Sequence, residues 1–111
     1  MFDKEKILQQ ELMNDGQSVF LHYCRAFGKY VAYGWSAYYA DMGTTPELTY
    51  SVVRQMPVAL LDKRCVFDLK HVMTQVSHTP DDEYHFRSRA PIGDLGYDRW
   101  TKSIKRRSLI L

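Results

Sequence analysis

Apolar residues recur at every third or fourth position in two segments of the chain, 3–13 and 66–76. In the second segment, Leu69, Val72 and Met73 fall on one side of a helix with 3.6 residues per turn. The first segment repeats this spacing among good helix formers, and an Asn-Asp-Gly turn signal follows it. Both segments are therefore predicted to be amphipathic helices.

The segment 18–40 holds eight of the chain's fifteen aromatic residues, and two patterns compete in it. Its rings step by three and four, as on one face of a continuous helix, but its first part is also a short apolar run typical of a buried strand. A continuous helix would include Gly28 and Gly34, each of which costs about 1 kcal/mol relative to alanine. We therefore favour a strand near 18–25 and a helix near 28–40.

The segment 46–56 also has two interpretations. The sequence Thr-Pro-Glu at 45–47 would start a helix well, whereas the residues at 48–53 are rich in strand formers and nearly alternate. We favour a strand here, and a second strand at 84–89, where aromatic and polar residues alternate.

Together these elements predict a single α+β domain over residues 1–111, with helices that flank a small mixed β-sheet. The predicted helices lie near 3–13, 28–40 and 66–76. The rival fold is an all-α bundle, which requires 17–41 and 46–55 to be helical.

Length and composition agree with one globular domain. The chain has 111 residues, of which 45% are hydrophobic and 25% are charged, and these values exclude a wholly disordered chain. Cys24 and Cys65 lie far apart in the sequence and are predicted to be free thiols that pack as small apolar groups. No secretory signal and no run of about 18 apolar residues is seen, so we expect a cytoplasmic protein without a membrane contact.

The residues that could carry chemistry form no known catalytic pattern. His71, His78 and His85 recur every seven residues, but they span a predicted helix, a loop and a strand, so this spacing does not bring three ligands to one point. The chain lacks GxSxG, HExxH and catalytic-cysteine motifs. We therefore predict that the protein is not an enzyme and has no catalytic residues, metal ligands or cofactor.

The density of tyrosine and tryptophan predicts a surface that binds a partner. Tyrosine combines a large apolar ring with a polar tip, so it is frequent at protein interfaces. The residues expected to form this face are Tyr30, Tyr33, Trp35, Tyr38 and Tyr39.

Basic residues offer a second kind of surface. The formal net charge is only +2, but the segment 99–111 contains five basic residues and no acid, and its apolar residues are spaced as in a helix. Such residues can neutralise phosphates. The predicted nucleic-acid contacts are Arg25, Lys29, Arg87, Arg89, Lys102, Lys105, Arg106 and Arg107.

The pattern Arg-x-x-Gly-Lys-Tyr-x-x-Tyr-Gly-x-x-Ala over 25–37 resembles the opening of the N-terminal mobile domain of MutS-type mismatch-repair proteins. Arg25 falls on that family's arginine, Tyr30 on its tyrosine and Ala37 on the alanine that opens a helix. The similarity extends over roughly residues 5–90 with few identities.

This resemblance implies a mixed sheet with flanking helices and a DNA-binding ancestry. The phenylalanine and glutamate with which the family reads a mismatch fall on Lys29 and Val31. A wedge between bases needs a large apolar side chain, so the family's reading device is not expected in this chain.

Two functions follow as hypotheses. The first is a non-catalytic interaction module that binds a protein partner or a second copy of itself through the Tyr-rich face. The second is a nucleic-acid-binding module that uses the basic residues. Binding through phosphates weakens steeply with salt, whereas an aromatic interface tolerates salt, so salt dependence distinguishes the two.

Overall fold

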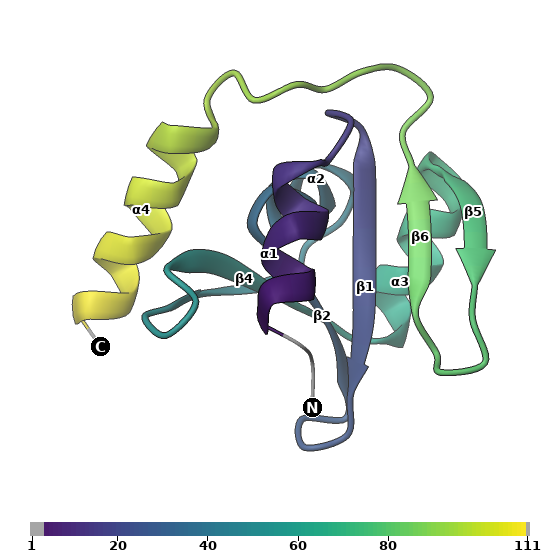
Figure 1. Ribbon diagram of the computed structural model, residues 1–111, viewed down its shortest axis with the longest axis horizontal. Helices are drawn as coiled ribbons and strands as arrows, with labels where there is room; N and C mark the ends of the chain where they lie inside the picture. The colour runs from purple at the N-terminus through teal and green to yellow at the C-terminus, as the bar shows by residue number, and fades with distance from the viewer. Residues whose placement is uncertain (1–3, 111) are drawn as a thin grey trace.

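The computed structural model describes the backbone of residues 4–110 and the side chains of residues 5–107. Within this range four helices flank one six-stranded sheet (Figure 1). The elements in chain order are α1 (Lys4–Leu12), β1 (Ser18–Cys24), β2 (Lys29–Tyr33), α2 (Gly34–Gly43), β3 (Glu47–Ser51), β4 (Met56–Leu61), α3 (Lys63–Val72), β5 (Thr74–His78), β6 (Tyr84–Arg87) and α4 (Tyr97–Ile110).

The strands lie in the order β3-β4-β2-β1-β6-β5, and all five pairings between them are antiparallel. The predicted α+β class is therefore confirmed, and the all-α bundle is wrong. The expectation of a mixed sheet is also wrong, because short hairpin connections and the return of β6 alongside β1 leave no parallel pair among the described strands.

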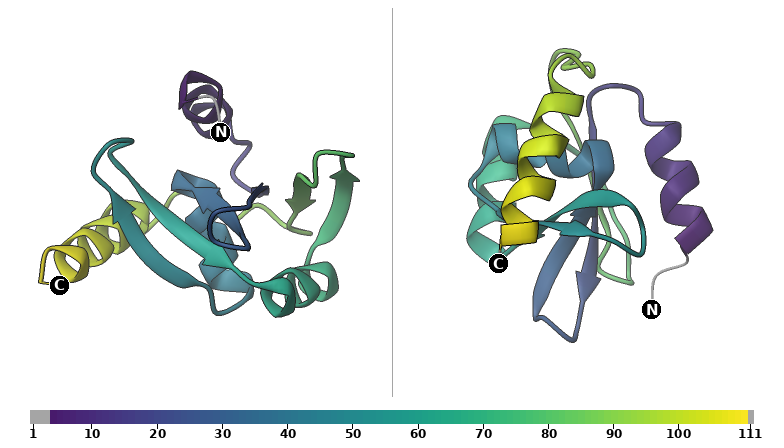
Figure 2. Two further views of the ribbon diagram at one scale, coloured as in Figure 1. Left: turned by 90° about the horizontal axis from the view of Figure 1, so that it is seen from below. Right: turned by 90° about the vertical axis from the view of Figure 1, so that its left-hand side faces the viewer.

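The sheet separates two apolar cores. Along β2, Tyr30 and Ala32 face the core that α2 and α3 complete, whereas Val31 and Tyr33 face the core that α1 completes. Figure 2 shows α1 standing apart from the other helices, on its own side of the sheet. The α2 side is the larger core, and α4 joins it through Trp100, whose Nε1 donates to Asp41 at 2.9 Å.

The helix expected near 28–40 begins later than predicted. The first part of this segment is strand β2, which lies between β1 and β4 and is buried on both faces. The aromatic residues of β2 therefore follow the alternation of a strand and not the period of a helix. Gly34 then turns the chain from strand to helix with a φ of +57°, a conformation that favours glycine. The aromatic spacing of three and four arises from two different elements.

The helix expected near 66–76 is displaced towards the N-terminus. α3 begins after Asp62, whose side chain caps it by accepting a hydrogen bond from the Cys65 backbone N–H at 2.9 Å. It ends at Val72, because Met73 has an extended backbone, and residues 74–78 form strand β5 instead. The apolar spacing continues across the end of the helix by coincidence.

The other elements agree with the sequence. The helix near 3–13 corresponds to α1, although residue 3 lies outside the described residues. The strands near 18–25, 46–56 and 84–89 correspond to β1, β3 and β6. The described part of the basic segment 99–111 lies in α4. Cys24 and Cys65 are both free, as predicted.

Candidate binding cleft between α1 and the sheet

Helix α1 covers only part of its face of the sheet. Beside it lies a cleft of about 610 Å³ between α1 and strands β1, β6 and β5, which we name the α1 cleft. Lys6 and Gln10 line it from the helix, Phe20 and His22 from β1, and Ser77 from β5. Small-molecule sites typically enclose about 300 to 1,000 Å³, so the α1 cleft has the size of a binding site.

The alternation of side chains along β1 determines which of its residues face the cleft. Phe20 and His22 are two residues apart on β1 and therefore point to the same face of the sheet. His85 of β6 lies opposite Phe20 in the register, and the two rings stack with centroids 4.4 Å apart. This face of β1 is thus aromatic, whereas its other face enters the larger core.

The most closely coupled pair in the cleft is His22 and Glu83. The His22 Nδ1 lies 2.7 Å from Glu83 Oε2, with the histidine buried and the carboxylate side chain 40% exposed. Burial lowers the pKa of His22, and the contact with Glu83 opposes this effect. At neutral pH, His22 is therefore uncharged with its proton on Nδ1, and Glu83 fixes the orientation of the ring.

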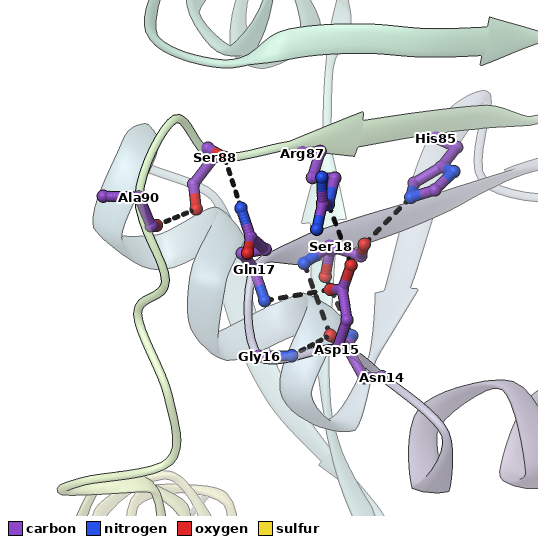
Figure 3. A network of polar contacts seen from close by, with 9 residues as sticks. All are labelled: Asn14, Asp15, Gly16, Gln17, Ser18, His85, Arg87, Ser88 and Ala90. Atoms are coloured by element: carbon purple, nitrogen blue, oxygen red, sulfur yellow. Dashed lines mark hydrogen bonds and ion pairs between the residues drawn. The ribbon is translucent and has the colours of Figure 1, made fainter.

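The second histidine of the cleft is held from the start of β1. His85 Nε2 lies 2.9 Å from Ser18 Oγ, and burial lowers the pKa of His85 below its usual value. Figure 3 shows that Ser18 belongs to a tight turn in which Asn14 Oδ1 accepts from the backbone N–H groups of Gly16 and Ser18. This turn fixes the end of α1 relative to β1.

Contacts from the far end of β6 hold the same turn (Figure 3). Arg87 Nε donates to Asp15 Oδ2 at 2.9 Å, and Gln17 Nε2 donates to the Ser88 carbonyl at 2.8 Å. At this end of the α1 cleft, these contacts therefore connect the turn between α1 and β1 to the end of β6.

A buried carboxylate anchors α1 itself. Glu11 is 2% exposed, and its two oxygens accept hydrogen bonds from the Ser36 backbone N–H at 2.8 Å and from Ser36 Oγ at 2.6 Å. Ser36 Oγ in turn accepts from the Phe20 backbone N–H at 3.0 Å. Burial raises the pKa of Glu11 to about 7, although the hydrogen bonds from Ser36 oppose the shift. Glu11 thus links α1 to the first turn of α2 and to β1.

The five residues expected to form an exposed Tyr-rich face do not form one. Tyr30, Tyr33, Tyr38 and Tyr39 are buried, and Trp35 is half-buried. The physical reason is their position, because β2 is a central strand and α2 packs its ring-bearing side against the sheet. This part of the prediction is wrong, since these rings build the cores.

The predicted nucleic-acid contacts fall into three separate places. Lys29 is paired with Cys24 at one end of β1, and Arg87 with Ser18 at the other, about 20 Å away along a seven-residue strand. The third place is α4, which packs against β3 at the edge opposite β5 (Figure 1). The three groups are Arg25 with Lys29, Arg87 with Arg89, and Lys102 with Lys105, Arg106 and Arg107.

Several of these cations already have a partner within the molecule. Lys29 Nζ lies 3.3 Å from a Glu47 oxygen, and Lys105 Nζ lies over the Tyr50 ring, 5.4 Å from its centre. The structure therefore brings the residues of α4 together but does not join the three groups into one basic surface.

The three regularly spaced histidines are also separated. His71 is at the end of α3, and His78 Nε2 lies 2.7 Å from Asp82, whereas His85 belongs to the α1 cleft. In the part of the chain that the structure describes, no three His, Cys, Asp or Glu residues are grouped so that they could hold a metal ion.

Sequence reasoning missed Glu11, His22 and Glu83. A usable signal existed for two of them: Glu11 lies four residues after Ile7 on the apolar side of α1, and His22 interrupts an apolar run. Glu83 carried no such signal, because only the return of β6 alongside β1 brings it to His22.

No protein-family model, curated protein or solved structure matches this chain. Among its described helices, none has both the length and the apolar character needed to cross a bilayer.

Proposed function

We propose that this protein is a non-catalytic interaction module that self-associates by pairing the edge strand β5 of two copies. The observation that carries the proposal is the state of β5, which is the end strand of the sheet and has all five side chains exposed. Natural edge strands are protected by lysine, proline, charged side chains or bulges. β5 reads Thr-Gln-Val-Ser-His, and its one protective feature is a bulge between Gln75 and Ser77.

The opposite edge of the sheet is different. Helix α4 packs against β3, and the first residue of β3 is the charged Glu47. Of the two edges among the described strands, β5 therefore offers the less protected backbone.

A second copy of the chain is a suitable occupant because β5 complements itself. Two identical strands that pair antiparallel about a twofold axis present the same surface to each other, and no like charges meet when the strand contains no Lys, Arg, Asp or Glu. Exposed apolar side chains accompany it: Val76 in β5 is 53% exposed, and Val72 and Phe67 on the adjacent α3 are 49% and 61% exposed. Pairing would bury part of this surface in both copies.

Sedimentation velocity across a wide concentration range tests the proposal. A small interface of this kind gives weak association, so we expect a monomer–dimer equilibrium that is visible at high protein concentration. Val76→Lys places two like charges near the twofold axis and should give a monomer. The matched control is Thr49→Lys on β3, which should leave the dimer intact. A wild-type chain that stays monomeric at millimolar concentration refutes self-association, as does a dimer that survives Val76→Lys.

The basic side of α4 favours a second candidate function, nucleic-acid binding. Arg99, Lys102 and Arg106 are spaced by three and four residues, so they lie on one side of the helix, and all three are exposed. If this row contacts phosphates, the logarithm of the binding constant for DNA should fall with that of salt with a slope of about −2.7, since each contact contributes about −0.9. Fluorescence anisotropy with the triple glutamine variant measures this slope, and an unchanged affinity in that variant would exclude α4 as the contact.

A further inference from the structure

We infer that the α1 cleft binds a small organic cation, such as an ammonium or amidinium group carried on an apolar body. Its volume of about 610 Å³ leaves room for a ligand the size of one aromatic ring with its substituents. Ser77 is the one residue of β5 that lines the cleft, whereas the proposed contact between copies uses the outer edge of that strand, so the two can be tested separately.

The charges that line the cleft favour a cation. Asp81 and Glu83 contribute two carboxylates, and Lys6 is the one lysine or arginine among the described residues that line it. His22 and His85 add no positive charge at neutral pH, because burial lowers the pKa of each. The described residues that line the cleft therefore sum to one net negative charge, in a concave site where water is partly excluded and a charge interacts more strongly than in bulk solvent.

The neighbouring acid does not belong to the cleft. Asp82 accepts a hydrogen bond from the Tyr30 hydroxyl at 2.8 Å and lies 2.7 Å from His78 Nε2. Tyr30 belongs to the core on the α2 side of the sheet, and the His78 ring stacks on Tyr84 of the same core. The loop between β5 and β6 thus divides its three consecutive acids. Asp82 stabilises the fold, whereas Asp81 and Glu83 line the α1 cleft.

Glu83 has the geometry of a preorganised acceptor. His22 Nδ1 holds its Oε2 at 2.7 Å, yet the carboxylate side chain remains 40% exposed. A carboxylate held in this way loses little conformational entropy when a ligand arrives.

The walls supply apolar contacts beside the polar side chain of Gln10. Ile7 and the half-buried Phe20 line the same space and can contact an apolar body.

Three probes of nearly equal size test this inference: benzamidine, benzamide and benzoate. In titrations followed by amide chemical shifts, benzamidine should bind about tenfold more tightly than neutral benzamide, and benzoate should bind most weakly. The shifts should fall on α1, β1 and β6. Equal binding of the three probes, tighter binding of benzoate, shifts confined to other elements or no binding at all would each overturn the inference.

Two substitutions test whether the carboxylates of the cleft recognise the cation. Glu83→Gln retains an acceptor for His22 and should remove the preference for benzamidine over benzamide, and Asp81→Asn, at an exposed position, should reduce it without a risk to folding. The matched control is Glu47→Gln, which removes an exposed carboxylate on β3, outside the cleft, and should leave the preference unchanged. A preference that persists in both cleft variants would show that these carboxylates do not recognise the cation.

Discussion

Replacement of the buried Glu11 by glutamine should change how the stability of this protein depends on pH. Glu11→Gln keeps the size of the side chain and retains an oxygen that can accept from the Ser36 backbone N–H, but it removes the titrating carboxyl. The substitution therefore isolates the effect of charge on the contact between α1 and α2.

The size of the effect follows from the pKa of Glu11, which burial raises from 4.5 to about 7. Between these two pH values the folded protein binds more protons than the unfolded chain, so the free energy of unfolding falls as pH rises. The difference between about 7 and 4.5 corresponds to about 3 kcal/mol, because each unit of pKa corresponds to about 1.36 kcal/mol. This stabilisation is fully present below pH 4.5 and is lost as pH rises through 7.

The two histidines of the α1 cleft act in the opposite direction. Burial lowers the pKa of His22 and His85, so these groups reduce stability as pH falls below their usual value of 6.5. The free energy of unfolding of the wild-type chain therefore depends on pH through both effects. Because the variant retains both histidines, the difference between variant and wild type reports Glu11 alone.

Urea unfolding at about pH 5 and about pH 9 provides the assay. Over this interval the wild type should lose about 2.5 kcal/mol more than Glu11→Gln, because part of the effect is already lost at pH 5. An Asp41→Asn variant, which alters a side-chain hydrogen bond to Trp100 in the other core, serves as the control and should follow the wild type. Equal pH dependence in wild type and Glu11→Gln would refute the argument, since it would show that Glu11 titrates as it does in the unfolded chain.

Three further outcomes are expected. Gly96→Ala should destabilise more than Gly28→Ala, because both have a positive φ (+91° and +63°) and cost about 1–2 kcal/mol for it, but a Cβ at Gly96 would also lie 3.1 Å from the Tyr38 hydroxyl oxygen; equal losses in urea unfolding would contradict this. Cys24 should react with a thiol reagent faster than the buried Cys65, whose pKa burial raises, and equal rates would argue against the described packing. Hydrogen exchange should be faster in α1 than in α2, and uniform protection of the two helices would show that α1 is held more firmly than its contacts indicate.

The fold could be predicted where one element accounts for a pattern. Alternation in β6 and the apolar run of β1 each reflect a single strand, and both were identified. The prediction failed at 28–40 because two elements meet there and jointly imitate a helical spacing. The positive φ of Gly34 marks the boundary between β2 and α2. In the sequence, a glycine indicates only that a helix is less stable there and does not show where the helix begins.

The candidate sites could be predicted much less well. The density of tyrosine predicts an exposed face, yet a tyrosine can also satisfy its hydroxyl inside a core: the Tyr38 hydroxyl donates to the Leu95 carbonyl at 2.7 Å. The pair of His22 and Glu83 could not be anticipated, because their separation of 61 residues is closed only by the pairing of β1 with β6. Sites of this kind depend on strand order, which local patterns do not specify.

The attachment of α1 connects the cleft to the stability argument. Ile7 and Glu11 are the two buried side chains among the described residues of α1, and the remaining ones are exposed or half-buried. A helix of nine residues has little stability of its own in water, so its position depends on these two contacts. Any change that charges Glu11 therefore loosens the wall of the α1 cleft before it weakens the larger core. A cation in the cleft would oppose this by contacting α1 and the sheet together, and so would stabilise the packing of α1 on the sheet by mass action.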